Sequence, residues 1–228
     1  MKIKIQLSIL VIGIMVTVIA IISFITLQRA SRMQKNAVMS GLNYMSGMYA
    51  TDIQRRFEGY LKTATNLSQI MKGYDDAPVD QRRIRYNGMM LSIIEENDDY
   101  LGAFTVWDVD ALDGKDAEYA NTPGTDATGR FISWYHRELD GVKLEPYNMY
   151  KEVWANAKRH STIASPVWRE ALGRKVLVVD VSAPVISQEG KLVGIVGINI
   201  DIAGMQDIVD KIKPFDTGIA TVYSNDGS

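Results

Sequence analysis

An apolar segment near the amino terminus constrains this chain more than any other feature of its sequence. From Ile5 to Leu27, about 23 residues include only a few polar side chains, and roughly 20 apolar residues suffice for a helix to cross the hydrocarbon core of a membrane. No glycine, proline or turn signal follows the segment until Gly41. The sequence therefore predicts a transmembrane helix over 5–28 that continues directly into a second, amphipathic helix.

Two other interpretations of this segment are weaker. A cleaved signal peptide has a shorter apolar region, of about 7 to 15 residues, and a small-residue cleavage site that the sequence after Leu27 does not offer. A buried core helix is rarely this long and apolar. Basic residues flank both ends, so the positive-inside rule leaves the orientation open. We expect the tail 1–4 to be cytoplasmic, because so short a tail is easier to retain than a folded domain.

An apolar stripe follows the anchor. From Val38 to Met71, apolar residues recur every three or four positions, which is the period of an α-helix, and turn-forming residues begin at Gly73. The sequence predicts a stalk helix over 29–73, and the stripe alone would extend on the order of 50 Å. The stripe should pack against a sheet. It could also form the seam of a homodimer, although the charged neighbours that fix coiled-coil pairing are sparse.

The composition excludes several classes of protein. Without cysteine, the chain can have no disulfide scaffold, thiolate metal site or cysteine nucleophile. The formal net charge is -2 and no basic block lies outside the flanks of the anchor, so we expect no nucleic-acid partner. His136 and His160 match no metal motif, and we expect neither a metal nor a cofactor. Ser161 beside His160 lacks a nucleophile-elbow pattern, so we do not expect an enzyme.

A second helix and a strand are expected after the stalk. Apolar periodicity predicts a helix from Asp80 to about Glu96. Its expected packed face comprises Ile84, Met89, Met90, Ile93 and Ile94. The aromatic and β-branched segment 100–109 then predicts a strand.

Two later segments predict an antiparallel hairpin. Segments 176–185 and 192–202 are rich in β-branched residues, and the sequence QEGK between them suits a tight turn. Gly194 and Gly197 inside the second segment predict a bend or a close backbone approach. Helices followed by several antiparallel strands indicate an α+β fold.

Several segments together resemble a known family. The strand ending in TVWDV, the segment DAEYANTPGTDATGRFISWY and the hairpin SAPVISQEGKLVGIVGINIDIAGMQDIV are similar to the membrane-distal half of a double Cache domain. That family supplies the extracytoplasmic sensors of chemoreceptors, histidine kinases and cyclic-dinucleotide enzymes. The resemblance covers roughly 34–228, and the hairpin is its most specific part. It implies a PAS-like antiparallel-sheet module, the membrane-distal one, over 74–212. It also implies that a membrane-proximal module only begins at 213–228, in a fragment or truncated product.

The resemblance also implies a ligand-binding site. In amino-acid-binding members, an Arg before a Trp-Tyr pair, a later Tyr and an Asp in the glycine-rich strand form the distal pocket. Such an Arg donates to a ligand carboxylate, the Asp accepts from an ammonium, and the aromatic walls exclude water. Asn199 stands where the Asp is expected, so Asp180, Asp201 or Glu170 could supply the missing charge. The expected ligand-binding residues are Trp107, Tyr119, Arg130, Trp134, Tyr135, Tyr147, Asp180 and Asn199.

Structural alternatives exist for these residues. Trp107, Trp134 and Trp168 could fill a core, Arg130 could pair with a neighbouring carboxylate, and Tyr119 could anchor its loop. The acidic run DVDALDGKDAE misses the EF-hand spacing by one residue. We therefore expect a solvated turn there rather than a calcium site.

The combined prediction is the extracytoplasmic small-molecule sensing domain of a transmembrane chemoreceptor. Its ligand would be an amino acid, an amine or another small polar metabolite, bound in the distal module and signalling through the long helix to cytoplasmic output domains. We expect an inner-membrane protein with a periplasmic or extracellular sensor domain that forms a homodimer through the long helix. The alternatives are the sensor region of a histidine kinase or diguanylate cyclase, or a membrane-anchored dimerisation module that binds no ligand.

Overall fold

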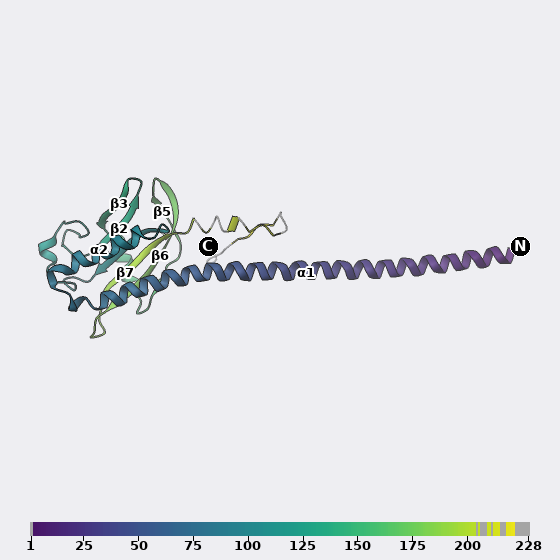
Figure 1. Cartoon of the computed structure of the whole chain (residues 1–228), viewed down its shortest axis with the longest axis horizontal. Helices are drawn as coiled ribbons and strands as arrows, with labels where there is room; N and C mark the ends of the chain where they lie inside the picture. The colour runs from purple at the N-terminus through teal and green to yellow at the C-terminus, as the bar shows by residue number, and fades with distance from the viewer. Residues whose placement is uncertain (1, 204, 206–208, 211, 215–217, 222–228) are drawn as a thin grey trace. The chain divides into compact units, whose positions relative to one another are not determined.

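The computed structural model of the chain contains two compact units, 1–52 and 53–228, each described here by itself. The structure describes residues 2–203, 205, 209–210, 212–214 and 218–221. Most of the predicted beginning of a second module, 213–228, lies outside the described residues. Figure 1 labels the helices and strands.

The first unit is the amino-terminal part of helix α1 (Lys2–Lys72). Every side chain from 5 to 37 is exposed, including the large apolar ones between Ile5 and Leu27. Exposed apolar surface around a whole helix is unfavourable in water and favourable in lipid. Among the described residues, α1 is the one helix long and apolar enough to cross a membrane, by length and composition.

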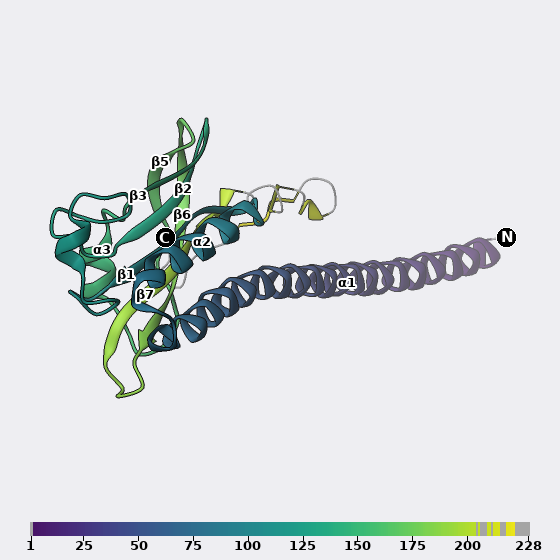
Figure 2. The same cartoon turned by 60° about the vertical axis from the view of Figure 1, so that its left-hand side comes forward.

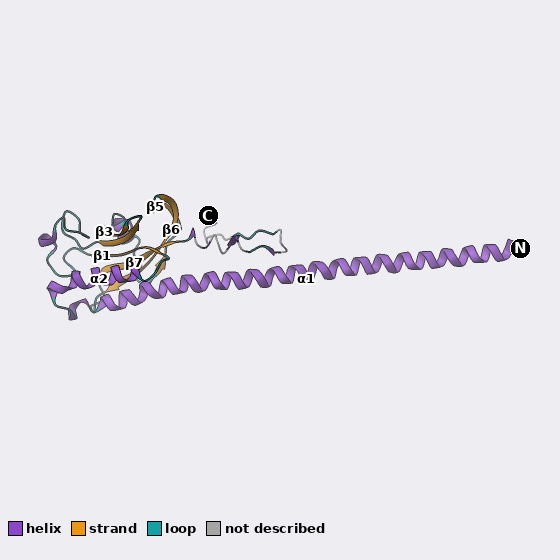
Figure 3. Cartoon of the chain, turned by 45° about the horizontal axis from the view of Figure 1, so that its top comes forward, coloured by secondary structure: helices purple, strands orange, loops and turns teal. Residues whose placement is uncertain are grey.

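The second unit is an α+β domain, as predicted (Figure 3). It begins with the end of α1, which stops at Lys72, next to the predicted stop at Gly73. The other helical elements are η1 (Tyr74–Asp76), η2 (Val79–Gln81), α2 (Arg82–Glu95), η3 (Asp116–Tyr119) and α3 (Tyr150–Ala155). The strands are β1 (Tyr100–Trp107), β2 (Ser133–Glu138), β3 (Gly141–Pro146), β4 (Thr162–Ile163), β5 (Val167–Ala171), β6 (Arg174–Ile186) and β7 (Leu192–Asp201).

One antiparallel sheet organises this unit. Its strands lie in the order β3-β2-β1-β7-β6-β4, and β5 also pairs with β6. The predicted hairpin of β6 and β7 is confirmed. The hairpins β2–β3 and β5–β6 extend on the same side of the domain (Figure 2). Their tips approach each other, because a Cβ atom added to Gly173 would lie 3.3 Å from Cδ1 of Leu139. The sheet therefore curls enough to bring its two ends together.

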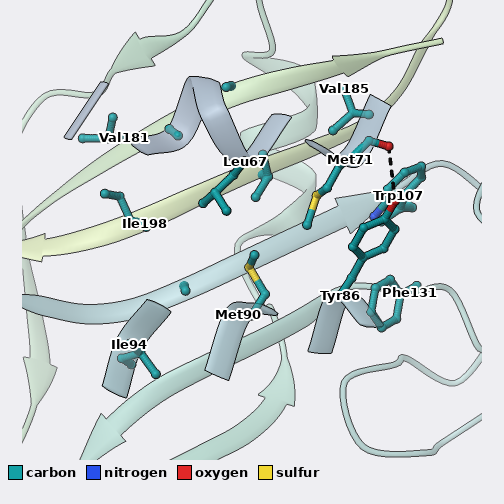
Figure 4. Packing of buried hydrophobic residues seen from close by; sticks show 14 of the residues in the cluster. Leu67, Met71, Tyr86, Met90, Ile94, Trp107, Phe131, Val181, Val185 and Ile198 are labelled. Atoms are coloured by element: carbon teal, nitrogen blue, oxygen red, sulfur yellow. Dashed lines mark hydrogen bonds between the residues drawn. The ribbon is translucent and has the colours of Figure 1, made fainter. Parts of the chain in front are cut away.

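The main core lies between one face of the sheet and the helices α1 and α2. Leu67 and Met71 of α1, Met90 of α2 and Trp107 of β1 are buried together (Figure 4). The hydroxyl group of Tyr86 donates to the carbonyl oxygen of Met71, 3.3 Å away, which links the two helices. Burying each large apolar side chain contributes roughly 1.5–3 kcal/mol. This packing confirms the predicted stripe over its last two turns.

The packed face of α2 differs from the prediction at its beginning. The helix occupies nearly the predicted range, and Met90 and Ile94 are buried as expected. Ile84, however, is 73% exposed, and Arg83 is buried in its place. The prediction for Ile84 was wrong because neighbouring residues of a helix point about 100° apart. The buried face starts at a charged residue, which an apolar pattern does not reveal.

Gly197 confirms the close backbone approach predicted for the glycine-rich strand. It lies opposite Phe104 of β1 and Ser182 of β6. A Cβ atom at Gly197 would lie 2.4 Å from Cζ of Phe104, so the absence of a side chain makes room for that ring. The phenylalanine can therefore lie flat across β7, on the face of the sheet away from α1 and α2.

Candidate ligand-binding site

The sheet face away from α1 and α2 carries a separate set of residues, since successive side chains of a strand point to opposite faces. A second buried apolar cluster forms its floor, with Phe104, Val106, Ile132, Tyr147 and Ile195. Partly buried residues of α3 pack against this floor. Polar side chains from four strands and one loop adjoin it. We call Trp134, Tyr147, Arg169, Asp180 and Asn199 the Asp180 cluster.

The carboxylate of Asp180 is the hub of this cluster. Arg169 Nη2 donates to Oδ2 at 2.6 Å, and Asn199 Nδ2 donates to Oδ1 at 2.7 Å. The hydroxyl group of Tyr147 lies 3.4 Å from Oδ2. Asn199 in turn accepts from Nε1 of Trp134 at 2.9 Å. The Asp180 side chain is only 12% exposed, so these donors replace the water that a carboxylate otherwise needs.

Strand register brings these residues together. Asn199 of β7 lies directly between Asp180 of β6 and Gly102 of β1. Trp134 lies opposite Phe104, two residues along from Gly102 on the same face. A Cβ atom at Gly102 would lie 2.5 Å from Nε1 of Trp134 and 2.6 Å from Oδ1 of Asn199. The glycine thus leaves the space in which the Trp134–Asn199 hydrogen bond forms.

Burial and charge shift the proton affinities in the cluster. Burial raises the pKa of the Tyr147 hydroxyl far above its usual value, and the negative charge of Asp180 raises it further. Burial alone would lower the pKa of Arg169, but Asp180 and Tyr147 together more than offset this effect, and the pKa is raised. Tyr147 therefore stays a neutral hydrogen-bond donor and Arg169 stays charged throughout the physiological pH range.

Aromatic rings adjoin the Asp180 cluster. The rings of Tyr147 and Phe104 stack with centroids 4.3 Å apart. Trp134 stacks on His136 at 3.9 Å and tilts by 58° against Tyr147 at 5.6 Å. Tyr147 and Trp134 reach the cluster with their donor edges, and the Asp180 carboxylate is the group there that attracts a cation.

Arg130 lies elsewhere on the same face. Its Nε donates to the carbonyl oxygen of Trp107, five residues along β1 from Gly102. Its guanidinium carbon lies 5.2 Å from the ring centre of Tyr150 and 5.0 Å from that of Trp154, both on α3. Its Nη2 is buried and has no hydrogen-bond partner among the residues that the structure describes. Arg130 can therefore donate to an anionic group, but not beside Asp180.

The other predicted residues lie outside the Asp180 cluster. Trp107 is fully buried in the core on the helix side of the sheet, where its Nε1 donates to Thr105. Tyr135 packs against that same core. Trp168 is 61% exposed, so the alternative that it fills a core was wrong. Trp134, Tyr147, Asp180 and Asn199 are the predicted residues that the fold brings together.

The structure distinguishes the three carboxylates considered as partners of Asn199. Asp180 contacts its amide directly. Asp201 pairs instead with Arg174, Nη2 to Oδ2 at 2.6 Å, and Glu170 is exposed on β5. The sequence reasoning missed Arg169. The residue faces the same side as Asp180 by strand alternation, and only the register of β5 and β6 reveals that.

A buried ion-pair cluster fixes the loop before Arg130. Arg83 of α2 lies 2.6 Å from carboxylate oxygens of both Asp113 and Asp116, and Nη1 donates to the carbonyl oxygen of Gly129 at 2.8 Å. Its guanidinium carbon lies 4.2 Å from the ring centre of Tyr119, which therefore anchors this loop. The expected solvated turn was wrong here. The acidic run folds around a guanidinium group, which sequence spacing did not indicate.

No group of three or more histidine, aspartate or glutamate side chains is arranged to hold a metal ion in the part of the chain that the structure describes. The sheet face presents a shielded carboxylate, neutral donors and aromatic rings at one place, and a guanidinium group held against aromatic rings at another.

Solved structures with a similar fold are sensor domains. The extracellular domain of mmHK1S-Z2, described as a histidine kinase, superimposes with a TM-score of 0.67 and 27% identity over 77% of this chain. The chain has the fold of an extracellular sensor domain. The periplasmic sensory domain of the chemoreceptor Tlp1 of Campylobacter jejuni has the same fold, with a TM-score of 0.53, 15% identity and 78% of this chain covered.

One curated relative points the same way. The methyl-accepting chemotaxis protein TlpQ of Pseudomonas aeruginosa is 23% identical over 135 residues, 50% of this chain. No protein-family model matches the sequence. The chain spans 19% of TlpQ, 65% of the mmHK1S-Z2 chain and 63% of the Tlp1 chain. Together with the apolar helix, this fold is that of a membrane-anchored protein with an extracellular sensor domain.

Proposed function

We propose that this chain is the extracytoplasmic sensing region of a transmembrane chemoreceptor, and that the sheet face bearing the Asp180 cluster binds a small polar molecule such as an amino acid or an amine. The observation that carries the proposal is the shielded Asp180 carboxylate, which sits among donors and aromatic rings on a face that α1 and α2 leave free. Such convergence of a few polar groups over an apolar floor is the usual composition of a small-molecule site.

Several parts of the proposal concern organisation. Residues 5–28 would anchor the chain in the inner membrane, with 1–4 cytoplasmic and 29–73 as the stalk. The ligand-binding module would be 74–212, and 213–228 would begin the next module. We also propose a homodimer through the stalk, supported by the apolar period of its sequence.

A sensing role requires no catalysis. The one serine adjacent to a histidine in the sequence, Ser161, has its hydroxyl oxygen 2.6 Å from that of Thr65 on α1. That contact links α1 to the sheet, since Thr162 beside it pairs with Ser182 of β6. The Ser161–Thr65 contact therefore contributes to the packing of α1 against the sheet.

A ligand screen tests the proposal. The whole chain in lipid nanodiscs would be screened by thermal shift against amino acids, amines, purines and organic acids. We expect at least one compound to raise the melting temperature in a saturable way, and Asp180→Asn to abolish the rise. Asp201→Asn is the matched control, because it removes the same charge from another Arg–Asp pair of the same sheet. A broad screen without any binder, or equal loss in both variants, would favour a dimerisation module without a ligand.

A histidine kinase is the second candidate for the whole protein. The extracellular domains of mmHK1S-Z2 and mmHK1S-Z3, both described as histidine kinases, are 27% and 26% identical to this chain. The gene separates the two candidates. A kinase core in the same reading frame supports the second, and a long helical methylation region supports the first.

A further inference from the structure

The carboxylate that the proposed ligand would need is already paired with a cation of the chain itself. Arg169 Nη2 lies 2.6 Å from Asp180 Oδ2, and the Arg169 side chain is 22% exposed. The Asp180 cluster is therefore neutral as it stands. A ligand cation must either share the carboxylate or replace the guanidinium group.

Arg169 and Asp180 lie on the same face of the sheet, but they are not direct cross-strand neighbours. Arg169 lies opposite Val176 on β6, and Asp180 is four residues further along that strand. At about 3.3 Å per residue, their strand positions are roughly 13 Å apart, whereas cross-strand partners are about 5 Å apart. The long side chain must run lengthwise over the sheet to reach the carboxylate, and ordering it in this way costs side-chain entropy.

The Arg169 side chain can leave Asp180 without disturbing a packed core. β5 pairs with β6 alone among the described strands, and its residues Val167, Trp168 and Glu170 are exposed. Moving the guanidinium group into water would therefore open no core. Arg83 is the contrast, because its guanidinium is buried against two carboxylates and a carbonyl group.

The remaining cluster is complete for a cation without Arg169. Asn199 still donates to one carboxylate oxygen and the hydroxyl group of Tyr147 to the other, while Trp134 donates to Asn199. Among the described residues, no guanidinium or ammonium group of the chain lies over the ring of Trp134 or Tyr147. A free ammonium or guanidinium group fits the position that the head group of Arg169 holds.

We propose that Arg169 is an intramolecular competitor for Asp180, and that a ligand carrying a primary ammonium or guanidinium group binds by displacing it. The ligand part rests on the proposed function; the competition itself does not. Arg169 thereby lowers the affinity of the site, since a tethered group acts at high effective concentration. Displacement removes the side-chain link between β5 and Asp180 while the backbone pairing of β5 with β6 remains, so that occupancy of the site removes one restraint on that hairpin.

Methylguanidinium chloride is the probe, because it is the free form of the competing group. Its binding to the whole chain in nanodiscs would be measured by saturation-transfer NMR and by thermal shift, at constant ionic strength. We expect Arg169→Gln to bind the probe at least about tenfold more tightly than the unmodified chain. Arg169→Gln combined with Asp180→Asn should lose this binding, and Arg174→Gln, which opens the neighbouring Arg–Asp pair, should behave like the unmodified chain.

Two results would overturn the proposal. If Arg169→Gln binds methylguanidinium no better than the unmodified chain, or binds it independently of Asp180, Arg169 is not a competitor. Arg169→Lys is the second variant, for the case in which Arg169→Gln does not fold. Its side chain keeps a positive charge but is shorter, so the variant should bind methylguanidinium more tightly than the unmodified chain. A failed ligand screen leaves these measurements untouched, so the two proposals can fail separately.

Discussion

Replacing Gly102 by alanine tests whether the Trp134–Asn199 hydrogen bond depends on an empty Cβ position. The new methyl group would lie 2.5 Å from Nε1 of Trp134 and 2.6 Å from Oδ1 of Asn199, and 3.1 Å from the carbonyl oxygen of Tyr135. Real Cβ contacts are not that short, so the indole or the amide must move. Because the two atoms are themselves 2.9 Å apart, either movement lengthens their hydrogen bond.

The expected cost combines three contributions. Inserting a methyl group into a packed site costs about 1–3 kcal/mol. Leaving the buried Asn199 oxygen without its donor costs about 1–3 kcal/mol more. The alanine recovers roughly 0.5–1 kcal/mol by restricting the unfolded chain, because Gly102 lies in an ordinary strand conformation. The variant should lose about 1–5 kcal/mol of unfolding free energy.

Urea denaturation of the whole chain in detergent micelles, followed by tryptophan fluorescence, measures this loss. Gly88→Ala in α2 is the control, because a Cβ atom there meets nothing within 4 Å; it should stabilise the protein by up to about 1 kcal/mol. Trp134→Phe removes the Nε1 donor, and in that background Gly102→Ala should cost about 1–2 kcal/mol less. The reasoning is refuted if Gly102→Ala is neutral, or if its cost is unchanged beside Trp134→Phe.

Three further predictions concern the loop before Arg130. Arg83→Met leaves Asp113 and Asp116 buried without their cation and should cost about 3–5 kcal/mol in the same denaturation assay. Burial would raise the pKa of Asp113, but Arg83 lowers it below the usual 3.8. The ionised Asp113 therefore stabilises the fold above pH 3.8, and this stabilisation disappears as the pH falls through its lower folded-state pKa. Denaturation measured between pH 5 and pH 2 should show the decline in unfolding free energy. Arg83→Met should remove that decline. Gly129→Ala places a Cβ atom 1.6 Å from the carbonyl oxygen of Asp116 at a φ of +81°, so circular dichroism should show more than about 4 kcal/mol of destabilisation or no native fold; near-normal stability contradicts the loop geometry.

Local periodicity explains why much of the fold could be predicted from sequence. The β6–β7 hairpin and the helix α2 each follow from a period and a turn, which neighbouring residues determine. Strand alternation also limits which predicted residues can lie together in the candidate site. Trp134 and Tyr135 are adjacent in β2, so they point to opposite faces of the sheet, and strand alternation alone allows only one of them beside Asp180.

Long-range polar pairing explains what the sequence could not give. Arg83 meets Asp113 and Asp116 because the loop returns to α2, and Arg169 meets Asp180 because β5 pairs with β6 in one register. A shift of β5 by one residue would turn Arg169 to the other face. Charged residue types suggest surface positions, but tertiary contacts hold these side chains in buried or partly buried ion pairs.

The same alternation that divides the site residues also connects the site to the helix. On β6, Asp180 faces the cluster, while Val179 and Val181 on either side of it are buried in the core that contains Leu67. Four residues further along, the carbonyl group of Pro184 accepts from the hydroxyl group of Ser68 on α1 at 2.6 Å. Since packed cores do not deform continuously, we infer that any movement of β6 at Asp180 also displaces side chains that α1 packs against. In this domain the site and the helix are separated by the thickness of one strand.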